Sequence, residues 1–320
     1  MEQHLFLNNS KINRVMPRAE EGIRSYRTHS IKTCLSREFP GFKYHIYSPS
    51  YGGEGLPVLV AVHGISHRAK EQARAFKEYA ECYGFVIIAP LFCRRNFPAY
   101  QRLGITKQEV PYYSDIALNS ILKEVAEQTG ALTEKVYLFG YSAGGQFVHR
   151  YAMAYPEKVY AVAVGAAGWY TFPDLKVSFP RGLAKQSLSR TMEFSCSKFL
   201  KIPMATFVGE NDNQSDSALK RSRRLDLQQG VTRIERAKNW IEAMRYAAEA
   251  VGFDTPYQCH IMKSCGHSFT DCVQSGQLAF KTINFLLEAT QHKSLLFKVS
   301  NQTENYHVAL LPSGYTLTNC

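Results

Sequence analysis

The stretch VYLFGYSAGGQFVHRYAMAY, residues 136–155, decides the fold of this chain. It begins with a continuous apolar run, which is typical of a strand buried on both faces of a sheet. We predict a strand over 135–139 and a helix over 145–155. Ser142 stands at the change from one to the other, in Gly140-Tyr141-Ser142-Ala143-Gly144.

A serine at such a turn adopts a strained backbone, and its side chain projects out of the bend. The residues two before and two after it approach each other closely, so both must be small, as Gly140 and Gly144 are. The free amides at the start of the helix can stabilise a developing oxyanion. We therefore predict that Ser142 is a nucleophile. The alternative is a glycine-rich turn whose serine merely caps the helix.

The chain around this stretch alternates between predicted strands and helices. We expect strands over 44–47, 57–63, 85–92, 159–164, 204–208 and 257–262, and helices over 69–82, 114–128, 233–251 and 273–289. Such alternation predicts parallel strand–helix–strand units and a doubly wound, mostly parallel sheet of the α/β class. In sheets of this kind, chemistry collects at the carboxyl ends of the strands.

Three segments fall outside the alternation. Residues 1–30 are predicted to be an N-terminal extension to one α/β domain over 31–292. Within that domain, 168–201 is too long for an ordinary loop and rich in aromatic residues, which predicts a cap-like insertion after the sixth core strand. The tail over 293–320 is predicted to be either a β-hairpin or loose.

A serine hydroxyl is a poor nucleophile until a histidine, oriented by a carboxylate, takes its proton. At strand-to-helix nucleophile turns the chain order is serine, carboxylate, histidine. His267 lies between a predicted strand and the last predicted helix, in Ser264-Cys265-Gly266-His267-Ser268. For the carboxylate, Asp212 and Glu210 both follow the strand over 204–208, and Asp216 is a third candidate.

Two further groups of residues belong to the predicted site. The oxyanion needs two amide donors, for which we expect Ala143 after the nucleophile and Ile65, with Ser66 as the fallback. Tyr141, Trp169 and Tyr170 are candidates to line a substrate pocket. Equally, these aromatic residues could pack the core of the insertion.

Taken together, four short motifs resemble the α/β-hydrolase superfamily: His63-Gly64, 140–145, 209–212 and Gly266-His267. The combination is most similar to the esterase branch with polyhydroxybutyrate depolymerases, feruloyl esterases and dienelactone-hydrolase-like proteins. The resemblance favours Asp212 as the acid, because a glycine followed three positions later by aspartate is usual there.

The same resemblance implies a mechanism without metal or organic cofactor. Ser142 attacks an acyl carbonyl, His267 transfers the proton, Asp212 supports the imidazolium, and water releases the acyl-enzyme. We expect a serine hydrolase that acts on a small or medium, partly hydrophobic carboxylic ester. Alternatives with the same machinery are a peptidase or amidase, a lactonase or an acyltransferase. A non-catalytic binding protein on the same fold is a further alternative.

The chain has 320 residues and a formal net charge of +11, which raises the question of nucleic acid as a partner. No known nucleic-acid-binding module is recognisable, so we expect none to bind. Basic residues cluster at Lys220, Arg221, Arg223, Arg224, Arg233, Arg236 and Lys238. Such a cluster is typical of a solvated helical face. It could also attract a carboxylate or phosphate on a substrate.

The eight cysteines are expected to be mostly free thiols of a cytoplasmic protein. Residues 1–30 lack the apolar core of a signal peptide, and no stretch is long enough to span a membrane. Cys265, His267 and Cys272 could bind zinc by residue type, but they lack paired ligand spacing, so we expect no metal.

Overall fold

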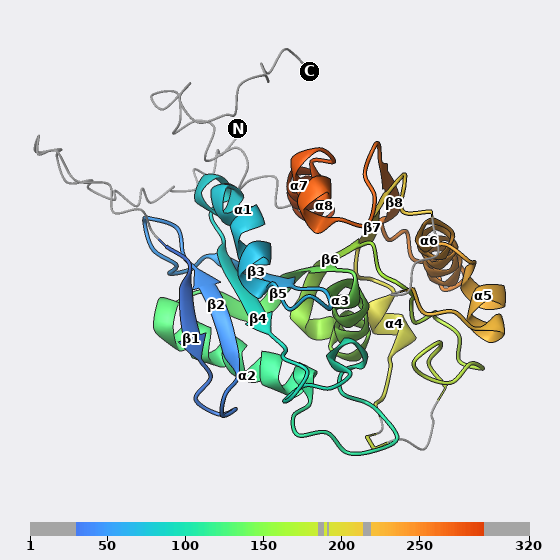
Figure 1. The fold of residues 1–320 in the computed structure, drawn as a ribbon, viewed down its shortest axis with the longest axis horizontal. Coiled ribbons are helices and arrows are strands. Elements are labelled where there is room, and N and C mark those ends of the chain that lie inside the picture. Colours follow the sequence, from blue (N-terminus) through green and yellow to red (C-terminus); the bar gives the residue numbers. More distant parts are fainter. Residues whose placement is uncertain (1–29, 185–188, 191, 214–218, 291–320) are drawn as a thin grey trace, which may run out of the picture.

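The computed structural model describes residues 30–290, except 185–188, 191 and 214–218 (Figure 1). The predicted N-terminal extension and tail therefore lie almost entirely outside the described residues. One sheet holds eight strands: β1 Lys32–Leu35, β2 Lys43–Tyr47, β3 Pro57–Val62, β4 Val86–Leu91, β5 Leu132–Tyr141, β6 Val159–Gly165, β7 Met204–Gly209 and β8 Tyr257–Met262.

The strands are ordered β1-β2-β4-β3-β5-β6-β7-β8 across the sheet. The six strands from β4 to β8 in this order run parallel, and β1 and β2 form an antiparallel edge. β4 lies on one side of β3, whereas β5 and the strands that follow it in the chain lie on the other side. This change in strand order is the pattern of a doubly wound fold. The predicted doubly wound, mostly parallel α/β sheet is thereby confirmed.

Helices cover both faces of the sheet (Figure 1). On one face pack α1 Ala69–Tyr83, α7 Phe269–Gln274 and α8 Leu278–Glu288; on the other pack α2 Ser114–Thr129, α3 Ala143–Ala154, α4 Cys196–Phe199 and α6 Arg233–Glu249. The short helices α5 Arg223–Gln229, η1 Tyr100–Arg102 and η2 Pro156–Lys158 lie in the connections.

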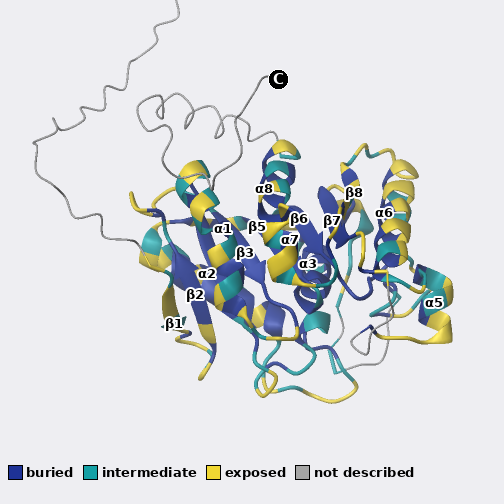
Figure 2. Ribbon diagram, turned by 45° about the horizontal axis from the view of Figure 1, so that its top comes forward, coloured by how far each residue is buried: buried dark blue, intermediate teal, exposed yellow. Residues whose placement is uncertain are grey.

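Each face of the sheet has its own hydrophobic core, because side chains alternate along a strand. In β3, Val60 packs with α2 and α3, whereas Leu59 and Ala61 join the core under α1 and α8. Figure 2 shows the central strands buried between the two helical layers. Burial on both faces explains why these strands are almost entirely apolar.

The structure differs from the sequence prediction near the end of the chain. The single helix expected over 273–289 is two helices, α7 and α8, separated at Ser275-Gly276-Gln277. Gln277 has φ +54°, a left-handed conformation that a continuous right-handed helix excludes.

The prediction also missed the edge strand β1, which has mostly exposed residues and no apolar run.

The expected cap-like segment over 168–201 is described in part. Leu175 is exposed, but most of the segment's large apolar side chains are buried, and most of these join the core on the α3 side: Tyr170, Phe172, Phe179, Leu183, Phe199 and Leu200. The segment thus contributes to the main core of the domain. Its role as a cap over the active site stays a prediction.

None of the helices within the described ranges combines the length and the apolar character that crossing a bilayer requires.

Candidate active site

Ser142 lies in a strained turn between β5 and α3, as predicted from the sequence. Its backbone has φ 55° and ψ −112°, and its N–H donates to the Gly165 carbonyl at 2.7 Å. A Cβ atom at Gly144 would lie 2.1 Å from the carbonyl oxygen of Val62, which is far closer than real contacts allow. The turn therefore requires glycine here, and it directs the Ser142 side chain away from the sheet.

His267 joins Ser142 to Asp212 through two hydrogen bonds. Its Nε2 lies 3.2 Å from Ser142 Oγ, and its Nδ1 lies 2.7 Å from Asp212 Oδ2. His267 comes from the loop between β8 and α7, and Asp212 follows β7, so the three residues come from three strand ends. With Nδ1–H donated to the carboxylate, Nε2 is free to accept the serine proton.

The three carboxylates considered from the sequence have different surroundings. Asp212 has a side chain only 2% exposed and contacts His267 directly. Glu210 is exposed, and its Oε2 accepts a hydrogen bond from the Ser264 N–H at 3.2 Å. Asp216 lies outside the described residues. Of the two described carboxylates, only Asp212 lies within hydrogen-bonding distance of the His267 ring.

Arg233 is a member of the site that the sequence prediction missed. Its Nη1 donates to Asp212 Oδ1 at 2.9 Å, and the two side chains are 1% and 2% exposed. The predicted solvated helical face is therefore wrong for Arg233, and also for Arg236, which is buried and paired with Asp226 at 2.7 Å. One oxygen of the Asp212 carboxylate thus binds His267, and the other binds the Arg233 guanidinium.

A periodicity in the sequence could have revealed these two arginines. The buried positions of α6 include Ala237, Trp240 and Met244, spaced three or four residues apart. Arg233 and Arg236 continue that stripe toward the helix start, one helical turn before Ala237 and Trp240. Both arginines therefore lie on the face of α6 that packs against the domain.

The expected oxyanion donors lie beside Ser142. Ala143 is the first residue of α3, where a backbone N–H has no acceptor within the helix. The loop that carries Ile65 approaches Ser142 from the other side, because a Cβ atom at Gly64 would lie 3.3 Å from Ser142 Cβ. The Ile65 side chain itself is exposed. Both backbone segments border Ser142, and their role as donors stays a prediction.

His63 anchors this loop from within the core. Its Nε2 accepts from the Phe92 N–H at 3.0 Å, so its Nδ1 carries the proton and donates to the Gly64 carbonyl at 2.6 Å. Tyr100 donates to the His63 carbonyl at 2.8 Å. Burial lowers the pKa of His63 to about 4, so the ring is neutral near pH 7. A buried, fully engaged ring of this kind positions the loop at Gly64.

Two of the aromatic residues expected to line the substrate pocket lie in the core. Tyr170 is fully buried and stacks on Trp240 at 4.7 Å between ring centroids. Tyr141 is 4% exposed, packs edge-on against Phe269 and contacts Cys272 through its hydroxyl. Both rings therefore pack the domain in this structure, and neither offers a surface to a substrate.

Trp169, the third of these residues, lines a cavity of about 230 Å³. The guanidinium carbon of Arg150 lies 4.3 Å from the centre of its ring. Trp169 is thus the aromatic candidate of the three that borders open space.

Cys272 lies close to the triad of Ser142, His267 and Asp212 but lacks the properties of a nucleophile. Burial raises the pKa of its thiol to about 12, so the reactive thiolate is scarce near pH 7. Both ring nitrogens of His267 are engaged by Ser142 and Asp212. In the ranges that the structure describes, no group of three or more histidine, cysteine or acidic residues is arranged to hold a metal ion.

Comparison with known proteins identifies the fold but no close relative. No protein-family model matches the chain, and no curated protein matches it. Solved structures do match. Poly(aspartic acid) hydrolase-1 from Sphingomonas sp. KT-1 is 24% identical with a TM-score of 0.65, over 75% of this chain and 93% of that chain.

Two further solved structures have similar coverage. LpqC, a poly(3-hydroxybutyrate) depolymerase from Bordetella parapertussis, is 24% identical with a TM-score of 0.63, over 80% of this chain and 94% of that one. An S-formylglutathione hydrolase from Agrobacterium tumefaciens is 14% identical with a TM-score of 0.53, over 82% and 94%. The resemblance seen in the sequence is confirmed at the level of the fold: this chain has the α/β-hydrolase fold.

Proposed function

We propose that this chain is a serine hydrolase that cleaves a carboxylic ester of a small or medium acyl group through an acyl-enzyme on Ser142. The observation that carries the proposal is the hydrogen-bonded series from Asp212 through His267 to Ser142. The fold alone supports many functions, so the reaction has to be argued from these side chains. The names of the structural neighbours, which include a poly(3-hydroxybutyrate) depolymerase and an S-formylglutathione hydrolase, agree with acyl chemistry.

The chemistry follows from the positions of the three residues. His267 Nε2 takes the hydroxyl proton as Ser142 Oγ attacks the acyl carbonyl, and the buried Asp212 carboxylate stabilises the imidazolium that forms. The amides of Ala143 and Ile65 are proposed to bind the oxyanion, which stabilises the transition state more than the ground state. The protonated His267 then donates its proton to the leaving alcohol. A water molecule, activated by the same ring, releases the acid.

Arg233 completes the proposed site as a positioning residue. Its charge balances that of Asp212 in a part of the protein that water does not reach. Arg233 also donates to Oδ1 of the carboxylate, so the other oxygen, Oδ2, is directed at His267.

Turnover of p-nitrophenyl esters of rising acyl length tests the proposal on the wild type and on Ser142→Ala. We expect the wild type to hydrolyse at least the shorter esters and the variant to lose at least about 10⁴-fold in kcat. A fluorophosphonate probe should label the wild type and not the variant. Labelling without turnover of any ester would favour the amide or acyl-transfer alternatives. Absence of both would favour a non-catalytic binding protein.

A further inference from the structure

A basic cavity is lined by residues outside the proposed site of Ser142, His267 and Asp212, and the proposed hydrolysis does not explain it. It measures about 230 Å³ and is bordered by Arg102, Trp169, Arg181, Lys220, Ser222 and Arg224 among others. A larger neighbouring cavity of about 500 Å³ shares Arg102 and Pro180 with it. Among the described residues, no aspartate or glutamate borders either space.

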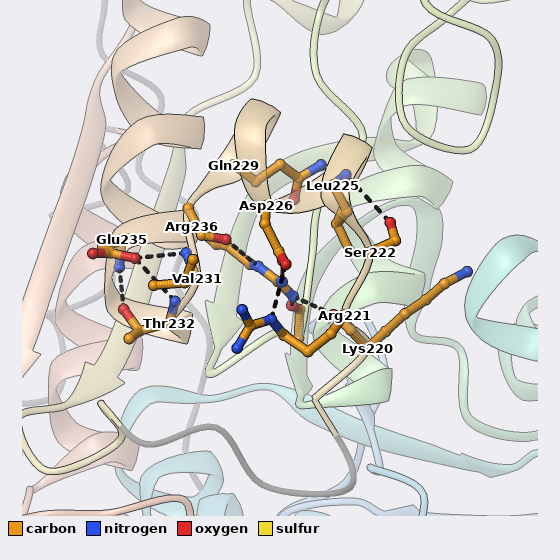
Figure 3. Close-up of polar contacts among 12 residues, drawn as sticks. Lys220, Arg221, Ser222, Leu225, Asp226, Gln229, Val231, Thr232, Glu235 and Arg236 are labelled. Carbon is orange, nitrogen blue, oxygen red and sulfur yellow. Dashed lines mark hydrogen bonds and ion pairs between the residues drawn. The ribbon is translucent and has the colours of Figure 1, made fainter.

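Two arginines close to Lys220 in the sequence are paired with a carboxylate, whereas Lys220 itself contacts an aromatic ring. Arg221 and Arg236 both bind the Asp226 carboxylate, at 3.0 and 2.7 Å. Lys220, by contrast, extends away from that network (Figure 3). Its Nζ instead lies 5.2 Å from the centre of the Trp169 ring.

Arg181, another cation of the basic cavity, likewise has no acidic partner among the residues that the structure describes. Its guanidinium donates to two uncharged oxygens, the Arg224 carbonyl and Gln228 Oε1. Burial lowers the pKa of Lys220, and three nearby arginines lower it further. Positive charges are therefore concentrated here, and no carboxylate of the described residues borders the cavity to offset them.

Arg150 adds a buried charge behind this cavity. The residue is fully buried in α3, and its guanidinium lies against Trp169. Its Nε donates to Thr171 Oγ1 at 2.9 Å and its Nη1 to the Gln101 carbonyl at 2.6 Å. Its Nη2 has no hydrogen-bond partner in the described part of the protein. A buried, incompletely satisfied cation is costly, which points to an anion that binds nearby.

Arg150 and Ser142 are connected by helix α3, which sets the distance between them. It lies on α3 eight residues after Ser142, which is roughly 12 Å along a helix axis. Gln146 lies between them, and its Oε1 accepts from Arg150 Nη1 at 3.4 Å. A ligand that occupied the basic cavity and also reached Ser142 would span a distance on this order.

We propose that the basic cavity binds an anionic group of the substrate, a carboxylate or a phosphate, remote from the bond that Ser142 attacks. The cavity offers the charge-assisted hydrogen bonds that such groups require, with Trp169 as its apolar wall. This inference rests on the proposed function for its substrate, but anion binding itself can be measured without turnover.

Binding is tested with Ser142→Ala as the parent protein, so that nothing is hydrolysed. Citrate and inorganic phosphate are titrated at constant ionic strength while tryptophan fluorescence is recorded, because Trp169 borders the cavity. We expect saturable binding, and about tenfold weaker binding when Lys220→Gln and Arg224→Gln are combined. The anion that binds more tightly identifies the recognised group. In Trp169→Phe the fluorescence change should disappear, while binding remains measurable by calorimetry.

Arg223→Gln is the matched control, since Arg223 is exposed on the same short helix and does not border the cavity. It should bind both anions as the parent does. If neither anion saturates the parent, or if the control weakens binding as much as the double variant, the inference is wrong.

Turnover by the protein with Ser142 intact provides the second test. The mono-p-nitrophenyl ester of sebacic acid carries a free carboxylate at its far end, and the methyl-capped ester is its neutral match. We expect a KM about tenfold lower for the anionic ester, with this preference lost in the double variant and kept in Arg223→Gln. If both esters are hydrolysed equally well, the anion-binding inference is wrong, whereas the proposed function stands. Anion binding without hydrolysis of any ester would instead contradict the proposed function.

Discussion

Arg233 and Asp212 form a buried ion pair, with Nη1 of the arginine 2.9 Å from Oδ1 of the carboxylate. The other oxygen of Asp212 binds His267 at 2.7 Å. The cation that neutralises the acid therefore comes from α6, whereas the acid and the histidine come from the ends of β7 and β8. A helix far from Ser142 in sequence thereby supports the geometry of the proposed site.

Replacing Arg233 with methionine should destabilise the protein and impair the site together. The Asp212 carboxylate would remain buried without its cation, and breaking a buried pair costs about 3–5 kcal/mol. We expect that loss in the free energy of unfolding from urea titration, and a lower kcat for p-nitrophenyl esters. Arg223→Gln, on the neighbouring helix, should leave both quantities close to wild type. Wild-type stability in Arg233→Met would show that the pair contributes little.

Asp212→Asn should reduce kcat on the order of 10⁴-fold, because an amide no longer holds the His267 tautomer with Nε2 free. Glu210→Gln is the control, since Glu210 is exposed and its carboxylate accepts a hydrogen bond from the Ser264 N–H in the loop after β8. Its kcat should remain within a few-fold of wild type. Both variants are assayed for kcat and for folding by circular dichroism. If Glu210→Gln loses more activity than Asp212→Asn, then Glu210 and not Asp212 is the carboxylate that orients His267.

Stability should fall as the pH drops below neutral, in part because of His63. The unfolded chain protonates this residue near pH 6.5, whereas burial holds the pKa in the folded protein at about 4. Between these values the unfolded state binds more protons, so a falling pH favours unfolding. From pH 7 to pH 5 this difference corresponds to about 2 kcal/mol of lost stability.

The contribution of His63 is isolated by comparing wild type with His63→Gln in urea titrations at both pH values. His149, whose pKa burial also lowers, is present in both proteins and cancels in the comparison. We expect the variant to be less stable at pH 7 but to lose less stability on acidification. Equal losses in the two proteins would indicate that His63 titrates normally in the folded state.

Gly144→Ala should disrupt the nucleophile turn, because the new Cβ would lie 2.1 Å from the Val62 carbonyl oxygen. Overpacking of this kind costs about 1–3 kcal/mol or more, and here the backbone that must move carries Ser142. Gly266→Ala is the control beside His267, where an added Cβ meets nothing within 4 Å. Thermal unfolding and fluorophosphonate labelling measure both effects. Normal labelling of Gly144→Ala would mean that the turn tolerates a side chain.

The sequence by itself determined the alternation of strands and helices and the position of the strained turn at Ser142. These are local properties, since a strand buried on both faces must be apolar along its length and a turn with a strained serine needs small neighbours. The order of Ser142, an acid and His267 along the chain was also predictable. The break between α7 and α8 was not, because it depends on one glutamine in a left-handed conformation.

Only the tertiary structure decided which charged residues are buried and what they contact. Glu210 and Asp212 are two residues apart after the same strand, yet one is exposed and the other is buried between His267 and Arg233. A run of arginines appears solvated in sequence, whereas packing of α6 buries two of them against carboxylates. The physical reason is that the cost of burying a charge depends on its partner, and these partners are brought together only by folding.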